Sequence, residues 1–247
     1  MKTFSTLLKT ELKLSLRDMN MFIFAICMPV VITVILGAIY GTTPAYEGST
    51  YSSFAQSFGA LSSIAILAGG VMGLPLLIAD YRAKKILKRF KVTPITPVII
   101  LVVNLTVYFL YAVVSLVLVY LVSVIFFDFQ LMGSWLQFVG SYLLTMLAMF
   151  SIGLLVGGIA PDMKTASTIA SLLYFPMLIF SGATLPYDIM PTAFQRFADV
   201  LPLTQAIHLL QATSLGFPID GVTFSIAVLL VLAVVCFALA IRFFKWE

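Results

Sequence analysis

Residues 98–127 read VIILVVNLTVYFLYAVVSLVLVYLVSVIFF, an apolar run without a charged side chain. A helix needs about 20 predominantly apolar residues to cross the hydrocarbon core of a bilayer. This run is longer, and a helix with such an excess tilts or projects beyond the hydrocarbon. The run therefore predicts a membrane-spanning helix and makes the chain an integral membrane protein.

The sequence on either side of this run repeats the same pattern. The 247 residues are 62% hydrophobic and 10% charged, whereas soluble domains carry about 25% charged residues. No stretch is polar enough or long enough to form a soluble domain. We therefore expect an all-α integral membrane fold in one transmembrane domain, with crossings at about 19–40, 54–79, 98–127, 135–160, 165–181 and 222–241.

The basic residues predict the topology. With six crossings, every lysine and arginine except Arg196 falls on one side of the membrane, and cytoplasmic loops are the basic ones. A seventh apolar window, 200–219, would reverse the side of Arg242 and Lys245 if it crossed. We expect a multi-pass protein of the plasma membrane with both termini in the cytoplasm.

An external element precedes the last crossing. Segment 186–218 contains Pro191 and Pro202, each placed where it opens a short helix. Polar residues make this segment costly to expose to lipid. The pattern predicts an extracellular re-entrant helical hairpin that dips into the outer leaflet.

The first eighteen residues predict an amphipathic helix that lies in the membrane interface. Apolar residues recur at helical spacing and the lysines occupy the other faces. The residues expected to place this helix are Phe4, Leu8, Lys9, Leu12, Lys13 and Leu16.

The loop between crossings two and three is the most basic part of the chain. Apolar residues form one stripe and basic residues fill the other faces. One interpretation is a topology determinant attracted to anionic lipid headgroups. The other is a short helix presented to a cytoplasmic protein. The residues concerned are Asp80, Arg82, Lys84, Lys85, Ile86, Leu87, Lys88, Arg89 and Phe90.

The sequence lacks the motifs of several kinds of nucleotide-binding and catalytic site. No glycine is followed by lysine, so the chain has no Gly-x-x-x-x-Gly-Lys phosphate loop. There is one histidine, and neither a zinc-protease nor a nucleophile-elbow motif. The basic residues follow the membrane topology and do not indicate a nucleic-acid partner. We expect a transport subunit rather than an enzyme, with neither cofactor nor metal in this chain.

Small residues and prolines predict how the crossings pack. The pairs Gly69 with Gly73 and Gly153 with Gly157 each lie one turn apart, which lets helix backbones approach closely. Packing within one chain is the simpler expectation, and packing between two copies stays open. Prolines inside crossings one, two and five predict kinks; they are Pro29, Pro75 and Pro176.

A translocation path would be lined by aromatic and a few polar residues, which favours an apolar or amphipathic substrate over an ion. Most aromatic residues of a membrane protein serve packing or the interfacial belt. The candidates for the path are Phe54, Phe58, Met72, Asn104, Tyr174 and Phe175.

The order of these features resembles the ABC type-2 permease family, the membrane subunits of ATP-binding-cassette exporters. The resemblance covers essentially the whole chain. It rests on the amphipathic N-terminal helix, on the basic loop ending KVTPITP at residues 91–97, and on SGATLP at residues 181–186. Residues 201–204, LPLT, are similar to the family's Asn-Pro-Leu-Thr, with Leu201 in place of asparagine. Ala83, Lys84 and Lys85 replace a more usual acidic-Gly-Thr run.

The resemblance implies that the exporter consists of several subunits with different roles. Residues 80–92 become the coupling helix that docks on a separate ATPase subunit, which binds ATP and magnesium. A second permease half, either an identical copy or a different chain, completes the exporter. Crossings one, two and five then face the translocation path.

Two other classes compete with this interpretation. A secondary transporter or channel typically has an internal repeat and buried acids, and neither is evident here. An intramembrane enzyme such as a lipid hydrolase needs convergent ionisable groups at one depth. The substrate stays open among drug-like compounds, small peptides, lipids and glycan carriers.

Overall fold

The computed structural model describes residues 2–17, 19–41, 43–46, 48–86, 97–184, 187 and 190–244, with the backbone alone at residues 2, 3, 20 and 97. Within these residues the chain is helical and has no β-strand. The first half comprises α1 (Lys2–Ser15), α2 (Met19–Phe22), the π-helical η1 (Ile23–Cys27), α3 (Met28–Tyr40), α4 (Ser53–Leu67), the π-helical η2 (Ala68–Gly73) and α5 (Leu74–Ala83). The second half comprises α7 (Pro97–Phe127), α8 (Trp135–Ile159), α9 (Met163–Phe180), α10 (Thr192–Val200), α11 (Pro202–Leu215), η4 (Ile219–Val222) and α12 (Thr223–Phe243).

Six helical stretches in the described part of the chain are long and apolar enough to cross a membrane. They span Ile23–Tyr40, Ser53–Ala83, Val98–Phe127, Trp135–Ile159, Met163–Phe180 and Ile219–Phe243. The expectation of a membrane protein with six apolar helices is confirmed. Crossing two is longer than expected, because α4, η2 and α5 continue through Ala83.

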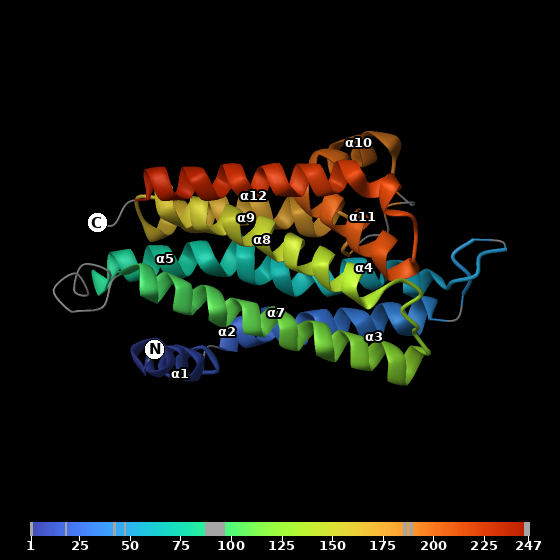
Figure 1. Cartoon of the computed structure of the whole chain (residues 1–247), viewed down its shortest axis with the longest axis horizontal. Helices are drawn as coiled ribbons and strands as arrows, with labels where there is room; N and C mark the ends of the chain where they lie inside the picture. Colours follow the sequence, from blue (N-terminus) through green and yellow to red (C-terminus); the bar gives the residue numbers. More distant parts are fainter. Residues whose placement is uncertain are drawn as a thin grey trace.

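Crossings two and four form the centre of the bundle (Figure 1). In their most apolar windows 78% and 72% of the residues are buried, against 22–28% in the other four crossings. The central helix α8 packs against α12, α5, η2 and α11, while α7 packs against α3 and α4 on the other side. The peripheral crossings therefore leave most of their apolar surface uncovered within one chain.

The two ends of the bundle differ in charge. The end of α5, the turn between α8 and α9, the end of α12 and the helix α1 gather at one end, and α10 lies at the other (Figure 1). We call the first the basic end; it holds Lys9, Lys13, Arg17, Arg82, Lys84, Lys85, Lys164 and Arg242. Arg196, in α10, lies at the opposite end. This separation matches the one predicted from the positive-inside bias.

Local signals in the sequence fix where helices begin and end. The Ser52 side chain accepts a hydrogen bond from the Ala55 backbone N–H at 3.1 Å, and Asp162 accepts one from the Thr165 backbone N–H at 2.8 Å. Both are N-caps that satisfy a free N–H of the first turn. The bond from Thr165 also holds the pKa of Asp162 below its ordinary value. Gly216, with φ of 77°, ends α11 in the left-handed conformation that glycine adopts readily.

Prolines in crossings one and two each follow a π-helical turn. Pro29 and Pro75 are second in α3 and α5, directly after η1 and η2. Proline removes one main-chain hydrogen bond and crowds the preceding turn, and a widened turn relieves that crowding. The two π-helical segments contact each other. Pro176 lies inside the α-helical α9.

Helices α10 and α11 form where the external hairpin was expected, but α11 lies deep in the bundle. Its 14 residues correspond to about 21 Å, too short for a crossing of about 30 Å. It packs against α4, α8 and α12, with most side chains buried. Its polar Gln205 is satisfied there: the Ser225 hydroxyl donates to Gln205 Oε1 at 2.8 Å, and Gln205 Nε2 donates to the Asp199 carbonyl at 2.8 Å. Entry of this pair into the outer leaflet stays a prediction.

Candidate functional site

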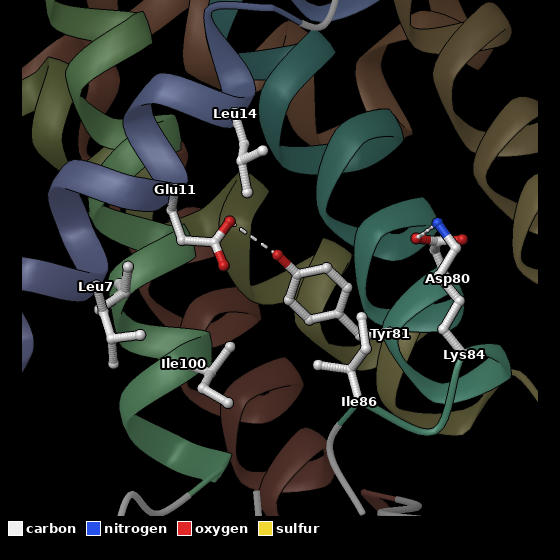
Figure 2. A pocket seen from close by; sticks show the side chains of 9 residues that line it. Leu7, Glu11, Leu14, Asp80, Tyr81, Lys84, Ile86 and Ile100 are labelled. Atoms are coloured by element: carbon white, nitrogen blue, oxygen red, sulfur yellow. Dashed lines mark hydrogen bonds and ion pairs between the residues drawn. The ribbon is translucent and has the colours of Figure 1, made fainter. Parts of the chain in front are cut away.

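A cavity opens at the basic end between α1, α5 and α7. Its volume is about 280 Å³. Figure 2 shows side chains from all three helices pointing into it. The lining is Leu7, Glu11, Leu14, Asp80, Tyr81, Lys84, Ile86, Ile100 and Val103. The cavity therefore lies between the N-terminal helix and the start of the basic segment, the two elements that the sequence predicts to be amphipathic.

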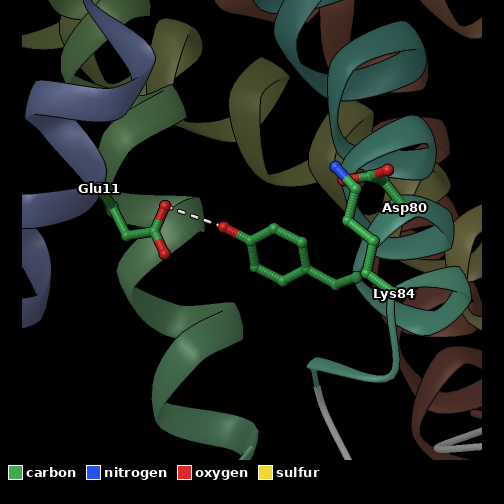
Figure 3. Close-up of polar contacts among 4 residues, drawn as sticks. Glu11, Asp80 and Lys84 are labelled. Carbon is green, nitrogen blue, oxygen red and sulfur yellow. Dashed lines mark hydrogen bonds and ion pairs between the residues drawn. The ribbon is translucent and has the colours of Figure 1, made fainter.

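A hydrogen-bonded group crosses this cavity. The Tyr81 hydroxyl on α5 donates to Glu11 Oε2 on α1 at 2.8 Å (Figure 3). The side chain of Asn104 on α7 lies next to the same hydroxyl and interacts with it electrostatically. The Asn104 amide also donates to the Ile100 carbonyl at 3.0 Å. Three helices therefore meet at one tyrosine hydroxyl, which we call the Tyr81 junction (Glu11, Tyr81 and Asn104).

The lysine in this cavity has its own partner. Lys84 Nζ lies 2.8 Å from Asp80 Oδ2, one turn earlier on the same helix (Figure 3). The Lys84 side chain is 64% exposed, so this ion pair contributes at most about 1 kcal/mol to stability. No basic nitrogen of a described residue lies within ion-pair distance of Glu11. The tyrosine hydroxyl is the polar partner that the structure gives this carboxylate.

The amphipathic N-terminal helix packs against the bundle with its apolar face. Leu8 and Leu12 contact a small cluster of Ala25, Val107 and Tyr111. Phe4 is half-buried, Lys9 and Lys13 are exposed, and Leu16 is 57% exposed. A helix forms where the periodicity predicts one, with Leu8 and Leu12 against the bundle, whereas Leu16 lies after the end of α1. The position of this helix in the headgroup region of a membrane stays a prediction.

The expected coupling segment begins as the end of crossing two. Asp80 and Arg82 belong to α5, and the chain turns at Lys84 and Lys85. Lys85 has a φ of 56°, a left-handed conformation that ends the helix as a glycine usually does. Ile86 lines the cavity. Leu87, Lys88, Arg89 and Phe90 lie outside the described residues.

Arg82 points into the bundle, toward the end of α8. Its side chain is 9% exposed. The guanidinium donates to the carbonyl oxygens of Gly157 and Gly158 at 3.1 Å each, and to that of Ala160. The last carbonyls of a helix have no partner within it, so Arg82 caps the end of α8. Its guanidinium carbon also lies 5.9 Å from the centre of the Phe244 ring.

Both predicted glycine pairs mediate close packing within this one chain. A Cβ placed on Gly153 would lie 1.9 Å from the carbonyl oxygen of Gly70, so α8 and η2 touch backbone to backbone. Gly157 faces Ile78 and Pro75 of α5. Gly69 and Gly73 accommodate the ring of Tyr108 on α7. The wide turn of η2 is therefore held between α7 and α8.

The candidate path residues do not gather in one place. Phe54 and Phe58 are each 1% exposed and belong to an aromatic cluster, where the Phe58 and Phe129 rings stack at 4.2 Å. Met72 is half-buried in η2, and Asn104 belongs to the Tyr81 junction. Tyr174 is buried, whereas the neighbouring Phe175 is 51% exposed on α9. None of them lines the cavity at the basic end, and their place on a path stays a prediction.

Two members of the junction, Glu11 and Tyr81, were not predicted from the sequence. Glu11 is the only acid of α1 and lies on its apolar stripe, three residues after Leu8 and four after Leu7. A lone acid on an apolar face is a signal that sequence reasoning can use. Tyr81 carries no such signal, because it sits between Asp80 and Arg82 in a charged stretch.

Known proteins share this sequence in part. Nodulation protein J of Rhizobium leguminosarum bv. viciae is 42% identical over 94 residues, which are 38% of this chain and 36% of that protein. Nodulation protein J of Rhizobium meliloti is 36% identical over 97 residues, 39% of this chain and 37% of that protein. The chain thus spans well under half the length of the relatives it matches.

A broader match covers most of the chain. The sequence profile of the ABC-2 type transporter family matches residues 2–215, from α1 to the end of α11. The matched region includes five of the six apolar helices, the basic segment and the Tyr81 junction. The chain belongs to the ABC-2 type transporter family.

Proposed function

We propose that this chain is the permease subunit of an ATP-driven exporter of the plasma membrane. The observation that carries the proposal is the family match over residues 2–215 in a chain with six membrane-length helices. The sequence contains no phosphate loop, so ATP and magnesium would be bound by a separate cytoplasmic ATPase subunit. Transport, rather than chemistry on a substrate, is then the role of this chain.

The basic end supports docking of that subunit. The exposed lysines Lys84 and Lys85 follow directly after crossing two, next to the cavity that joins α5 to α1. A charged surface of one sign steers a complementary partner and sets its orientation. We place the ATPase at this surface, with the membrane headgroups beside the exposed lysines of α1.

A second permease half would cover part of the peripheral helices. Crossings one and five bury only 22% of their most apolar windows within one chain. Their exposed side chains include Val34, Ile35, Leu172 and Phe175. A translocation path between two such faces would be apolar and would suit an amphipathic drug, peptide or lipid-like substrate. This second permease half can be another copy of this chain or a different permease.

The mechanism would be rigid-body switching between two packed arrangements. Closure of the ATPase dimer on ATP would move the elements at the basic end. The contacting π-helical turns in crossings one and two give each of these helices a point at which its two halves can change direction. Alternating opening of the path would follow from that change.

The test is purification of the chain in mild detergent from its native host. We expect a nucleotide-binding subunit to co-elute and the eluate to hydrolyse ATP. Reversal of Lys84, Lys85, Lys88 and Arg89 to glutamate should remove that subunit and the hydrolysis. Lys164→Glu with Arg242→Glu, which reverses charge at the same end but outside the segment, should retain both.

Other outcomes have definite meanings. A single protein without ATPase activity, found again in lipid nanodiscs, would favour a secondary transporter or channel. The complex could instead survive the fourfold reversal and be lost in the control pair. That result would indicate that the ATPase docks at the start of α9 and the end of α12.

A further inference from the structure

The helix α1 is held to the bundle in two different ways. Along α7 it is held by apolar packing of Leu8 and Leu12. Toward α5 it faces the 280 Å³ cavity, and the bond between Glu11 and Tyr81 spans that space (Figures 2 and 3). A cavity offers little packing resistance to a change in the spacing of its walls. The polar bond therefore links α1 directly to α5 across the cavity.

The chemistry of this bond makes it strong for a single contact. The acceptor is a carboxylate, and hydrogen bonds to charged groups are stronger than neutral ones. Glu11 is half-buried and forms no ion pair with a described residue, so the bond to Tyr81 replaces water that the carboxylate has lost. The side chain of Asn104 on α7 lies next to the same hydroxyl, which favours an orientation of the phenol ring toward α1.

The position of Tyr81 places the bond close to the start of the basic segment. Tyr81 lies one turn before the reversal at Lys84 and Lys85, where crossing two ends and the basic segment begins. A force applied to that segment reaches α5 first. From α5 it can pass directly to α1 through the hydrogen bond between Tyr81 and Glu11.

We infer that the Glu11–Tyr81 bond is a strut that makes α1 and the end of crossing two move as one body when the ATPase acts. The inference rests on the proposed function for the source of the force. Tyr81 is the positioning residue, Glu11 its anchor on α1, and Asn104 holds the ring in place. The match to the family does not identify the side chains that connect α1 to the end of crossing two.

The variants separate the bond from general packing. Tyr81→Phe removes the hydroxyl and leaves the ring. Glu11→Gln keeps an acceptor oxygen without the charge, and Glu11→Leu removes the acceptor. The control is Tyr142→Phe, which deletes the same hydroxyl from a 2.8 Å bond to the Ala112 carbonyl between α8 and α7 and involves no residue of α1.

The first measurement is amide hydrogen exchange of α1 in the purified protein without nucleotide. Tyr81→Phe and Glu11→Leu should each accelerate exchange in the half of α1 around Glu11 by about tenfold, which corresponds to roughly 1.4 kcal/mol. Glu11→Gln should give a smaller acceleration, and the double variant no more than either single change. Unchanged exchange in Tyr81→Phe, or equal acceleration in Tyr142→Phe, would overturn the strut.

The second measurement repeats the exchange experiment on the ATPase complex with and without Mg-ATP. In the wild type, α1 and the end of α5 should respond together. In Tyr81→Phe, the end of α5 should still respond while α1 no longer does; a response of α1 that persists would also overturn the strut. If neither element responds in the wild type, the proposed ATP-driven function fails, and the nucleotide-free experiment alone decides on the strut.

Discussion

At the scale of single residues, Arg82 and Lys84 show how neighbours in a charged run take opposite roles. Both belong to the segment that the sequence predicts to face a cytoplasmic partner. Arg82 is buried against the end of α8, whereas Lys84 is exposed and paired on its own helix. A planar guanidinium with five donors suits a cluster of free carbonyls better than an ammonium does.

The first prediction concerns this cap. Arg82→Ala should lower the free energy of unfolding by about 1–3 kcal/mol, because three carbonyl oxygens at the end of α8 lose their donor. Lys84→Ala should change it by less than about 1 kcal/mol, since its ion pair is exposed. Thermal unfolding in detergent, followed on both variants, checks the difference. Equal destabilisation by the two substitutions would contradict the capping of α8 by Arg82.

At the scale of elements, the centre of the bundle depends on the contact between α8 and the π-helical turn η2. Gly153 lets the two backbones touch, and Phe150 and Met149 close over Gly70 from the same side. Small residues at helix contacts were predictable from the spacing of the glycines. The widened turns were not, because a proline signals a disturbed helix but not whether it kinks or takes up an extra residue.

The second prediction uses two glycines of the same helix. Gly153→Ala should destabilise the protein by about 1–3 kcal/mol, because its Cβ would overlap the Gly70 carbonyl and force α8 outward. A Cβ at Gly140 meets nothing within 4 Å, so Gly140→Ala should be neutral or stabilising by up to about 1 kcal/mol. Comparison of the two melting temperatures in one detergent is the measurement. A tolerated Gly153→Ala would contradict the close contact.

At the scale of the whole molecule, the sequence predicts the number and order of the long apolar helices well, and the gathering of basic residues at one end of the bundle. Apolar runs and basic residues each leave a signal along the chain, and both concern how a segment meets lipid or headgroups. Contacts between distant segments leave no such signal. The Tyr81 junction joins residues from three helices. Phe54 and Phe58, predicted to line a path, are buried in an aromatic cluster of this chain, and their place on a path stays a prediction. Only the packed structure assigns such side chains to a neighbour.

The third prediction concerns topology. In a background with Cys27→Ala and Cys236→Ala, a cysteine replacing Arg196 should react with a membrane-impermeant maleimide in right-side-out spheroplasts. A cysteine replacing Lys164 should react only after permeabilisation, because it lies at the basic end. Labelling of both before permeabilisation would mean that the two positions are on the same side. The reversed pattern would place the basic end outside.

The π-helical turn η2 has a consequence for how this chain tolerates insertions and deletions. Such a turn takes up one residue more than an α-helical turn while the helix on either side keeps its phase. Loss of one residue within Ala68–Gly73 would leave Tyr81 and Arg82 on their present faces. Loss of one residue in the regular part of α4 would rotate both by about 100°. Crossing two thus contains a place where its length can vary in evolution without changing which faces its second half, α5, presents to its neighbours.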